Sequence, residues 1–267
     1  MKAYPVTILC KVMKVSRSGF YEYLKRYVDN PTDNTNDMVL NARIKAIFKL
    51  SRSSYGSRRM LEQLRSEGHK IGRYKVRRLM RDLGLKAKKR RRFKVTTESR
   101  HSFPVAANIL DRKFDVEKPN SVWTADISYV WTREGWLYLA VILDLHSRRV
   151  IGWAVSNRMK RDLAIRALKM AVALRQPPKG CIHHTDRGSQ YCSHDYQKLL
   201  RQHGFQVSMS GKGNCYDNSA VETFFKTIKA ELIWRQSWET RRAAEMAIFN
   251  YINGFYNPRR RHSALGW

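Results

Sequence analysis

Residues 121–156 have the sequence SVWTADISYVWTREGWLYLAVILDLHSRRVIGWAVS, and this stretch decides the fold of the chain. It holds three segments rich in valine, isoleucine, tryptophan and tyrosine, which span 121–132, 135–147 and 148–156. The turn-forming sequences TREG and HSR separate them. Because such side chains favour extended backbone, the stretch predicts three consecutive strands of one sheet.

Downstream of these strands, the sequence alternates between helical and extended patterns. We expect helices at 161–175, 194–204, 217–235 and 237–256, and two further strands at 180–186 and 205–210. Tight turns join antiparallel strands, whereas parallel strands need a longer crossover such as a helix. The core is therefore predicted to be α/β, with a five-stranded mixed sheet and helices on both of its faces.

Upstream of the core, positive charge dominates. The whole chain has 52 Lys and Arg against 22 Asp and Glu, a net charge of +30. Residues 1–100 hold 27 basic and 8 acidic side chains, a net charge of +19, and the remaining residues contribute +11. Such a chain repels itself unless a polyanion lies against it, so nucleic acid is the expected partner.

The patterns divide the chain into four segments. Residues 5–27 predict two short helices, the second capped by Ser16, which form either an arm packed on another surface or part of a helix-turn-helix. A polar linker is expected to follow at 28–37, and then three amphipathic helices. The predicted segments are a partial helix-turn-helix arm at 1–30, a helical DNA-binding module at 38–84, a basic linker at 85–118, and a catalytic core with a basic tail at 119–267.

Two groups of basic residues are predicted to contact DNA. In the last helix of the module, apolar residues recur at helical spacing, so three arginines face away from its core. These are Arg77, Arg78 and Arg81. The basic linker predicts phosphate contacts, which add affinity but carry no base information. This second group includes Lys89, Arg90, Arg91 and Arg92.

Acidic residues are scarce, and three of them fall at informative places. Asp126 lies inside the first predicted strand, where an unpaired carboxylate is costly. Asp186 ends the fourth strand, directly before the turn sequence RGS, and ligand-binding groups collect at such strand ends in α/β sheets. Glu222 lies one turn into the helix after the fifth strand. These three are the candidate catalytic and metal-binding residues.

Three carboxylates suit hard divalent cations, so two Mg²⁺ or Mn²⁺ ions are the expected cofactors. Two ions about 4 Å apart activate the attacking oxygen and stabilise the leaving oxygen in phosphoryl transfer. On the predicted helix, Glu222, Lys226 and Lys229 fall within about 60° of one another, which places two cations beside one ligand. The preceding loop lacks P-loop spacing, and we expect it to cover the site, with Lys212 near DNA.

Three segments resemble the signature segments of one protein family. WTADISYV, HHTDRGSQY and DNSAVETFFKTIKAEL closely resemble those of insertion-sequence transposases with a retroviral-integrase-like, ribonuclease-H-type core. Between Asp186 and Glu222 lie 35 residues, the spacing for which the D,D(35)E class is named. Lys229 matches the family's following basic residue. Upstream, SRSGFYEYLKR and YGSRRMLEQL look like helix-turn-helix parts of the same proteins, so the resemblance covers nearly the whole chain.

This resemblance implies a ribonuclease-H-like integrase core preceded by small all-α helix-turn-helix modules. It implies a DDE transposase, a polynucleotidyl transferase in which Asp126 bridges two metal ions while Asp186 and Glu222 each hold one. Water first frees a 3′-OH at a terminal inverted repeat, and that 3′-OH then attacks another strand. Lys229 is implied to contact DNA near the terminal nucleotides.

The resemblance also implies partners. These are double-stranded DNA, further copies of the chain on that DNA, and the product of an upstream reading frame. The chain starts in a partial helix-turn-helix and ends soon after RRRHSALG, as expected of an isolated second-frame (OrfB-type) product. The zinc-binding HHCC module of retroviral integrases is absent from the sequence.

Two other functions remain compatible with parts of the sequence. A non-catalytic DNA-binding regulator of transposition would lack one of the three carboxylates, and all three are present. A nuclease of the ribonuclease H type would be expected to have a fourth acidic ligand. Asp144 is expected to be structural instead, because it ends a strand before a turn. Asp217 is expected to cap a helix, and His183 and His184 to pack behind the site.

The remaining residues predict an ordinary interior. Four tryptophans, Trp123, Trp131, Trp136 and Trp153, are expected mostly in the core. The four cysteines form no CxxC pair and fit reduced thiols. No apolar run has the length of a membrane span, so a cytoplasmic protein is expected. The resemblance implies a bacterial protein associated with the nucleoid.

Overall fold

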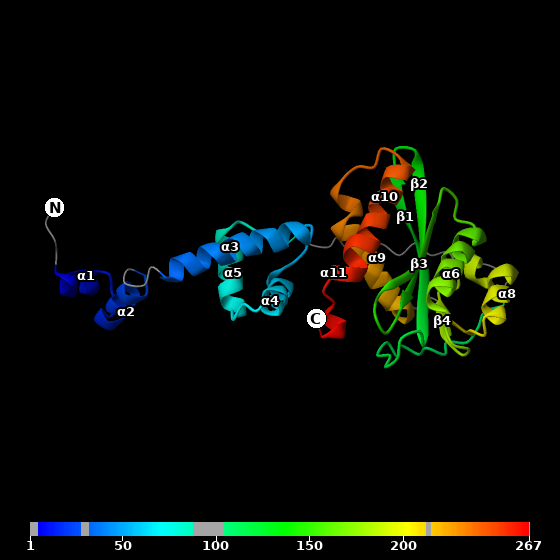
Figure 1. Cartoon of the computed structure of the whole chain (residues 1–267), viewed down its shortest axis with the longest axis horizontal. Helices are drawn as coiled ribbons and strands as arrows, with labels where there is room; N and C mark the ends of the chain where they lie inside the picture. Colours follow the sequence, from blue (N-terminus) through cyan, green and yellow to red (C-terminus); the bar gives the residue numbers. More distant parts are fainter. Residues whose placement is uncertain (1–4, 28–31, 88–103, 212–214, 267) are drawn as a thin grey trace. The chain divides into compact units, whose positions relative to one another are not determined.

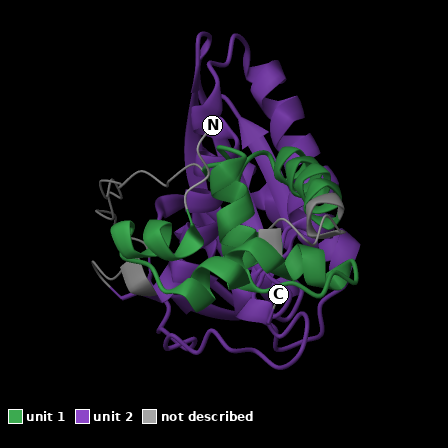
Figure 2. Cartoon of the chain, turned by 90° about the vertical axis from the view of Figure 1, so that its left-hand side faces the viewer, with its two compact units in different colours: residues 1–87 green, residues 88–267 purple. Residues whose placement is uncertain are grey.

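The computed structural model describes residues 5–27, 32–87, 104–211 and 215–266. The chain divides into two compact units, residues 1–87 and 88–267, which Figure 2 shows in separate colours. Within the described residues, no helix combines the length and the apolar character that crossing a membrane needs. Several basic residues for which the sequence predicts DNA contacts lie outside the described residues. These are Lys89, Arg90, Arg91, Arg92 and Lys212.

The first unit is helical. Its helices are α1 (Val6–Val12), α2 (Arg17–Tyr27), α3 (Thr32–Leu50), α4 (Ser57–Ser66) and α5 (Arg73–Asp82). The predicted cap of α2 is present, since Ser16 Oγ accepts a hydrogen bond from the backbone N–H of Gly19 at 3.0 Å. After α4 and α5 the chain turns at Gly68 and Gly84, both at positive φ, which glycine adopts without strain.

Helix α3 begins earlier than the sequence pattern predicts. The polar segment expected to be a linker is helical from Thr32 onward. Asp37 supplies the physical reason, because its carboxylate pairs with Lys75 Nζ at 2.6 Å and with Arg78 Nη2 at 3.0 Å, both on α5. These ion pairs attach the early turns of α3 to α5. Local composition cannot reveal such a tertiary contact.

The second unit is built on a five-stranded sheet with the strand order β3-β2-β1-β4-β5. The strands are β1 (Val122–Thr132), β2 (Gly135–Asp144), β3 (Val150–Ser156), β4 (Ile182–Thr185) and β5 (Gln206–Met209). The first three strands pair antiparallel, while β4 pairs with β1 and β5 pairs with β4 in parallel. The predicted mixed sheet is confirmed, and β1 is its central strand.

Helices cover both faces of this sheet. Figure 1 shows α6 and α8 on one side of it and α9, α10 and α11 on the other. The α-helices are α6 (Arg161–Arg175), α7 (Ser189–Cys192), α8 (His194–Gln202), α9 (Ser219–Glu231), α10 (Arg241–Tyr251) and α11 (Asn257–Arg259). Short turns of other types are η1 (Cys215–Asn218), η2 (Ile233–Arg235), η4 (Ser263–Leu265) and the π-helical η3 (Ile252–Tyr256). These short pieces are too brief to show a sequence periodicity.

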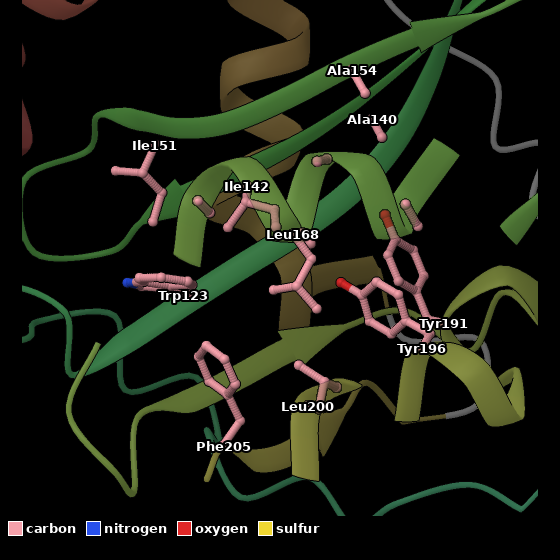
Figure 3. Close-up of a cluster of buried hydrophobic side chains, with 14 of the residues drawn as sticks. Trp123, Ala140, Ile142, Ile151, Ala154, Leu168, Tyr191, Tyr196, Leu200 and Phe205 are labelled. Carbon is pink, nitrogen blue, oxygen red and sulfur yellow. The ribbon is translucent and has the colours of Figure 1, made fainter. Parts of the chain in front are cut away.

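The main core lies between the sheet and helices α6 and α8. Figure 3 shows Trp123 of β1, Leu168 of α6 and Leu200 of α8 in this cluster. Strand β3 approaches α6 at Gly152, where a Cβ would lie 2.3 Å from the carbonyl oxygen of Ala167. Because successive side chains of a strand point to opposite faces, odd-numbered residues early in β1 face this core. The even-numbered residues of β1 therefore face the side covered by α9.

Two of the four tryptophans expected in the core are exposed. Trp123 is fully buried, but Trp131 is 59% exposed and Trp136 is 41% exposed. The prediction was wrong for these two because the β1–β2 hairpin extends beyond its neighbouring strands. β4 pairs with β1 only as far as Thr124. A run of aromatic residues signals a strand without showing where the neighbouring strands end.

Candidate active site

The register of the sheet brings Asp126 and Asp186 to the same level. Thr124 of β1 pairs with His184 of β4 in a parallel ladder. Each aspartate follows one of these two residues by two positions, so both continue the same face of the sheet. Neighbouring strands lie about 4.8 Å apart, so two residues far apart in the sequence become neighbours.

Helix α9 brings the third carboxylate to this place. Asn218, directly before the helix, donates a side-chain hydrogen bond to the carbonyl oxygen of Ala125 at 3.1 Å. This bond holds the start of α9 against β1, next to Asp126. Glu222 lies in the first turn of the helix, and its charge acts on Asp126. Strands β1 and β4 and helix α9 therefore collect the three candidate carboxylates.

The proximity of the other two carboxylates makes ionisation of Asp126 unfavourable. Its carboxylate accepts a hydrogen bond from the backbone N–H of Ile127 at 2.7 Å. Burial raises the pKa of Asp126 well above its usual range, and the charges of Asp186 and Glu222 raise it further. The N–H of Ile127 and the charge of Lys229 lower this pKa but do not compensate. The site therefore has an excess of negative charge.

Local contacts hold the other two carboxylates. Asp186 Oδ1 accepts a hydrogen bond from the N–H of Gly188 at 2.9 Å, and a Cβ at Gly188 would lie 3.0 Å from that same oxygen. Glu222 Oε2 forms an ion pair with Lys226 Nζ at 2.9 Å. Within the described part of the chain, no three His, Cys, Asp or Glu side chains already stand as a metal-holding group. Glu222 is engaged by Lys226 instead.

The donor set fits a divalent cation of the magnesium type. Asp126, Asp186 and Glu222 offer oxygen donors alone, which hard cations prefer. A cation bound here would also offset the repulsion that raises the pKa of Asp126. The chemistry and the charge of the three residues thus point to the same kind of ligand.

Lys226 and Lys229 lie on one helix but have different surroundings. Lys226 is about half exposed and pairs with Glu222. Lys229 is buried, and its ammonium lies 5.1 Å from the centre of the Tyr129 ring on β1. Burial lowers the pKa of Lys229, and the charge of Asp126 opposes this shift. Lys229 therefore reaches toward β1.

Two buried histidines support β4 behind Asp186. His184 contacts Ser208 Oγ through Nδ1 at 2.8 Å and Ser210 Oγ through Nε2 at 3.1 Å. Burial lowers the pKa of His184 to about 4, so its ring is neutral at neutral pH. His183 Nε2 lies 2.7 Å from the hydroxyl oxygen of Tyr196. The packing role expected of both histidines is confirmed.

Asp217 was expected to cap a helix and instead ties together distant segments. Its carboxylate accepts hydrogen bonds from Arg112 Nε at 2.9 Å, Asn108 Nδ2 at 3.1 Å and the N–H of Gly211 at 2.9 Å. Although burial raises it, the hydrogen bonds from Gly211 and Arg112 hold the pKa of Asp217 below its usual range. Asn218 occupies the cap position of α9. The prediction failed because two of the donors come from more than 100 residues away.

Asp144 has the structural role expected from the sequence. Its side chain is fully buried and accepts hydrogen bonds from the N–H of Asn120 at 3.1 Å and from the N–H and hydroxyl of Ser147. It therefore does not act as a fourth acidic group of the site.

The arginines of α5 differ in their availability. Arg77 and Arg81 are exposed and face away from the core of the first unit. Arg78 is partly buried and pairs with Asp37. The exposed surface of α5 therefore presents Arg77 and Arg81 of the three predicted arginines, together with Arg73 and with Tyr74, which is 82% exposed.

Family models match nearly all of the chain after its first helices. Residues 116–215 and residues 203–267 match integrase core domain models. Residues 35–93 match an HTH-like domain. These matches agree with the α/β sheet of the second unit and the helices of the first.

Named relatives cover almost the full length of the chain. The uncharacterized 31 kDa protein of insertion element IS600 from Shigella sonnei is 43% identical over 259 residues, which is 97% of this chain and 94% of that protein. Transposase InsF for insertion sequence IS3A from Escherichia coli (strain K12) is 41% identical over 263 residues, 98% of this chain and 91% of that protein. The HTLV-2 integrase catalytic core domain in complex with magnesium is similar at a TM-score of 0.41 and 19% identity, over 55% of this chain and 92% of that one. The chain belongs to the integrase-core transposase family that includes InsF of the IS3 insertion sequences, and its function is DNA transposition.

Proposed function

We propose that the chain cuts and joins DNA at the terminal inverted repeats of its element, with Asp126, Asp186 and Glu222 holding two divalent metal ions. The convergence of two further carboxylate charges on the partly buried Asp126 is the observation that carries this proposal. When bound, the two cations activate the attacking oxygen and stabilise the leaving oxygen of an in-line displacement. Asp126, Asp186 and Glu222 would together hold these ions through their carboxylate oxygens.

Binding of metal ions requires a change in the side-chain contacts of the carboxylates. Glu222 must turn away from Lys226 to bind a cation, because its Oε2 lies 2.9 Å from Lys226 Nζ. Lys226 can then pair with a DNA phosphate. Asp126 needs little movement, because its backbone is held in the sheet by pairing with Val141 of β2. Of the proposed metal ligands, Asp126 thus lies on a strand and Asp186 directly follows one. Glu222 lies on a helix, and its side chain must rotate.

The proposed reaction has two steps, and in each step one P–O bond forms and one P–O bond breaks. In the first step, a water oxygen bonds to the phosphorus at the element end, and the bond between that phosphorus and the 3′ oxygen breaks. The freed 3′-OH then attacks a phosphorus of target DNA, whose own 3′ oxygen leaves. No covalent bond to the protein forms, so the residues of the site position DNA and balance charge.

DNA binding is assigned to both units. The exposed Arg77 and Arg81 of α5 support a role for residues 38–84 as the module that recognises the terminal repeat. The basic linker at 85–118 would add phosphate contacts, and Lys229 would approach the terminal nucleotides. We propose further copies of the chain on the same DNA, and the product of the upstream reading frame, as protein partners.

A strand-transfer assay tests the catalytic assignment. Full-length protein is mixed with a duplex that carries the element end, with Mg²⁺ and with the upstream product, and joined 3′ ends are counted. Glu222→Gln is expected to lower joining about 1,000-fold, since removing a charged ligand costs several kcal/mol and every ~1.4 kcal/mol is tenfold. The matched control is Glu245→Gln, the same change on exposed α10, which should join DNA normally. The assignment fails if Glu222→Gln joins DNA like the wild type, or if no protein joins DNA at all.

A further inference from the structure

A pocket lies where the β1–β2 hairpin meets the end of α9, outside the three carboxylates. Its volume is about 480 Å³, within the range of ~300–1,000 Å³ that is typical of ligand pockets. Five of the eleven residues that line it are aromatic. The residues that matter here are Tyr129, Trp131, Trp136, Trp234, Trp238 and Lys229.

The aromatic rings of the hairpin are exposed and yet fixed. Tyr129 is 36% exposed, Trp136 is 41% and Trp131 is 59%. Trp136 meets both neighbours edge to face, with ring centres 5.0 Å from Tyr129 and 4.8 Å from Trp131. Large aromatic side chains are usually well buried, and clustered exposed ones mark a binding surface. Because the rings hold one another at set angles, their exposed surface is preorganised.

The opposite wall comes from the segment after α9. Trp238 is buried, and its indole N–H donates to the carbonyl oxygen of Ile233 at 3.1 Å, so this wall is anchored. Gln236 and Ser237 are exposed beside it and offer hydrogen-bonding groups. Arg133 also lines the pocket and pairs with Glu239 at 2.8 Å. The pocket thus combines flat apolar surfaces with a polar rim.

Lys229 connects this pocket to the carboxylates. Its ammonium lies 5.1 Å from the Tyr129 ring centre, and its charge also acts on Asp126. Tyr129 follows Asp126 by three residues on one strand, a separation of about 10 Å at ~3.3 Å per residue. Bases of one DNA strand in a duplex are spaced by ~3.4 Å, so this distance corresponds to roughly three nucleotides. Side chains three residues apart on a strand point to opposite faces, so a DNA strand held at Asp126 reaches the pocket around the edge of β1, which β4 leaves unpaired beyond Thr124.

We propose that this pocket binds an unpaired nucleobase of the DNA strand being processed, stacked on the ring of Trp131 and bordered by Trp136, within a few nucleotides of the reacting phosphodiester. This inference rests on the proposed function, which places that phosphodiester at Asp126. Every base has a flat face that stacks on aromatic rings, and Lys229 adds positive charge for the adjoining phosphate. The net charge of +30 favours a nucleic acid over a second copy of the chain as the occupant.

The test compares two DNA probes with the full-length chain in the presence of a chelator. One probe is a blunt duplex, and the other is the same duplex with a five-nucleotide single-stranded 3′ tail. The wild type is expected to bind the tailed duplex more tightly. Trp131→Ala should lower affinity for the tailed probe about tenfold, or ~1.4 kcal/mol, which is within the range for one base stacked on an aromatic ring. Trp131→Phe keeps a ring and should keep most of the preference.

Two controls separate stacking from charge and from folding. A tail of abasic nucleotides keeps its phosphates, and it should bind the wild type as weakly as the ordinary tail binds Trp131→Ala. Phe249→Ala removes an exposed ring of α10 that lies outside the pocket, and it should keep the preference for the tailed probe.

Three results would overturn the proposal. These are an unchanged tail preference in Trp131→Ala, an equal loss of affinity for both probes, or a loss of self-association in sedimentation with the tail preference intact. The last result would show that the patch joins copies of the chain. Because binding is measured without metal, it is independent of strand transfer. A failure of stacking is therefore distinguishable from a failure of the proposed catalytic function.

Discussion

Asp126 and Asp144 lie on neighbouring strands and have opposite surroundings. In the antiparallel pairing of β1 with β2, Asp144 is opposite Trp123 and Asp126 is opposite Val141. The two carboxylates are thus three residues apart along the same ladder. Asp144 accepts hydrogen bonds from Asn120 and Ser147, and Arg175 lies 3.8 Å away. Asp126 accepts one from Ile127 and faces two other carboxylates.

The difference shows how one fold uses the same side chain in two ways. The protein's own donors satisfy Asp144, so its charge stabilises the turn that follows β2. The charge of Asp126 is left uncompensated by the protein, which is costly unless cations from outside are bound. A partly buried carboxylate with too few donors therefore marks the proposed reactive end of this ladder, and a buried one with enough donors marks its structural end.

The largest effect that separates the two residues should be on activity. Asp126→Asn removes a charged ligand of the proposed metal site, so strand transfer should fall about 1,000-fold, the equivalent of several kcal/mol. Asp144→Asn, the same chemical change at the structural end, should keep activity per folded molecule within about tenfold. The measurement is the rate of 3′-end joining, normalised to the folded fraction from circular dichroism. Equal losses in the two variants would break the comparison.

The second-largest effect should be on the free energy of unfolding and should be seen on substitution of Asp144. Asp144→Ala leaves three partly buried donors of Asn120 and Ser147 without this acceptor and removes the carboxylate near Arg175, so the free energy of unfolding should drop by about 3 kcal/mol. Urea unfolding of the full-length chain measures this. Asp126→Ala is the control, and it should lose far less because it removes no such network. A larger loss for Asp126→Ala would contradict the assignment of the structural role to Asp144.

A smaller effect of opposite sign is expected for Asp126→Asn without metal. The variant should be more stable than the wild type by roughly 0.5–2 kcal/mol, as is common when a strained active-site group is removed. The pKa of Asp126 is raised on folding, from an unfolded value of about 3.9. Between these two pKa values the folded state keeps a proton that the unfolded state has released. Wild-type stability therefore falls as pH rises through this window.

The pH dependence of this difference is the critical measurement. Unfolding in chelator should show almost no difference between Asp126→Asn and the wild type below pH ~4, and a growing one toward neutral pH. Added Mg²⁺ should reduce the difference at neutral pH by stabilising the wild type. A difference that stays constant with pH, or that vanishes toward neutral pH, would exclude the burial of charge as its cause.

The sequence predicted the elements that carry the candidate carboxylates wherever local pattern and position in the chain agree. All five strands and the helices α6, α8 and α9 fall where the hydrophobic patterns place them. The parallel crossover from β1 to β4 then follows from topology, and with it the proximity of Asp126 to Asp186. The sequence predicts these features because strand patterns have a period of two and because the carboxyl ends of neighbouring parallel strands lie at the same edge of the sheet.

What the sequence could not show depends on long-range contacts. Asp217 was expected to cap a helix, but it binds Arg112 and Asn108 across more than 100 residues. The early start of α3 depends on ion pairs of Asp37 with α5. The exposure of Trp131 depends on where β4 ends. In each case a pattern gives the kind of element correctly, while a partner elsewhere in the chain decides the role of one side chain.

The smallest predicted effect concerns Glu222, which lies between the two extremes. Unlike Asp126, it already has a cation, because Lys226 pairs with it at 2.9 Å on a half-exposed helix surface. Such pairs contribute about 0.3–0.5 kcal/mol, so Lys226→Ala should change the free energy of unfolding by no more than this. Since Lys226 competes with metal for Glu222, its removal should tighten Mg²⁺ binding about twofold, the equivalent of the same energy.

Calorimetric titration of Mg²⁺ into the DNA-free chain measures the effect of Lys226→Ala. The matched control is Arg242→Ala, which breaks the exposed pair with Glu245 on α10 and should leave Mg²⁺ binding unchanged. Weaker Mg²⁺ binding in Lys226→Ala would mean that the lysine holds Glu222 in place for the metal. Glu222 would then resemble Asp144, a carboxylate positioned by the protein's own donors, and the contrast within the site would lie between Asp126 and Glu222.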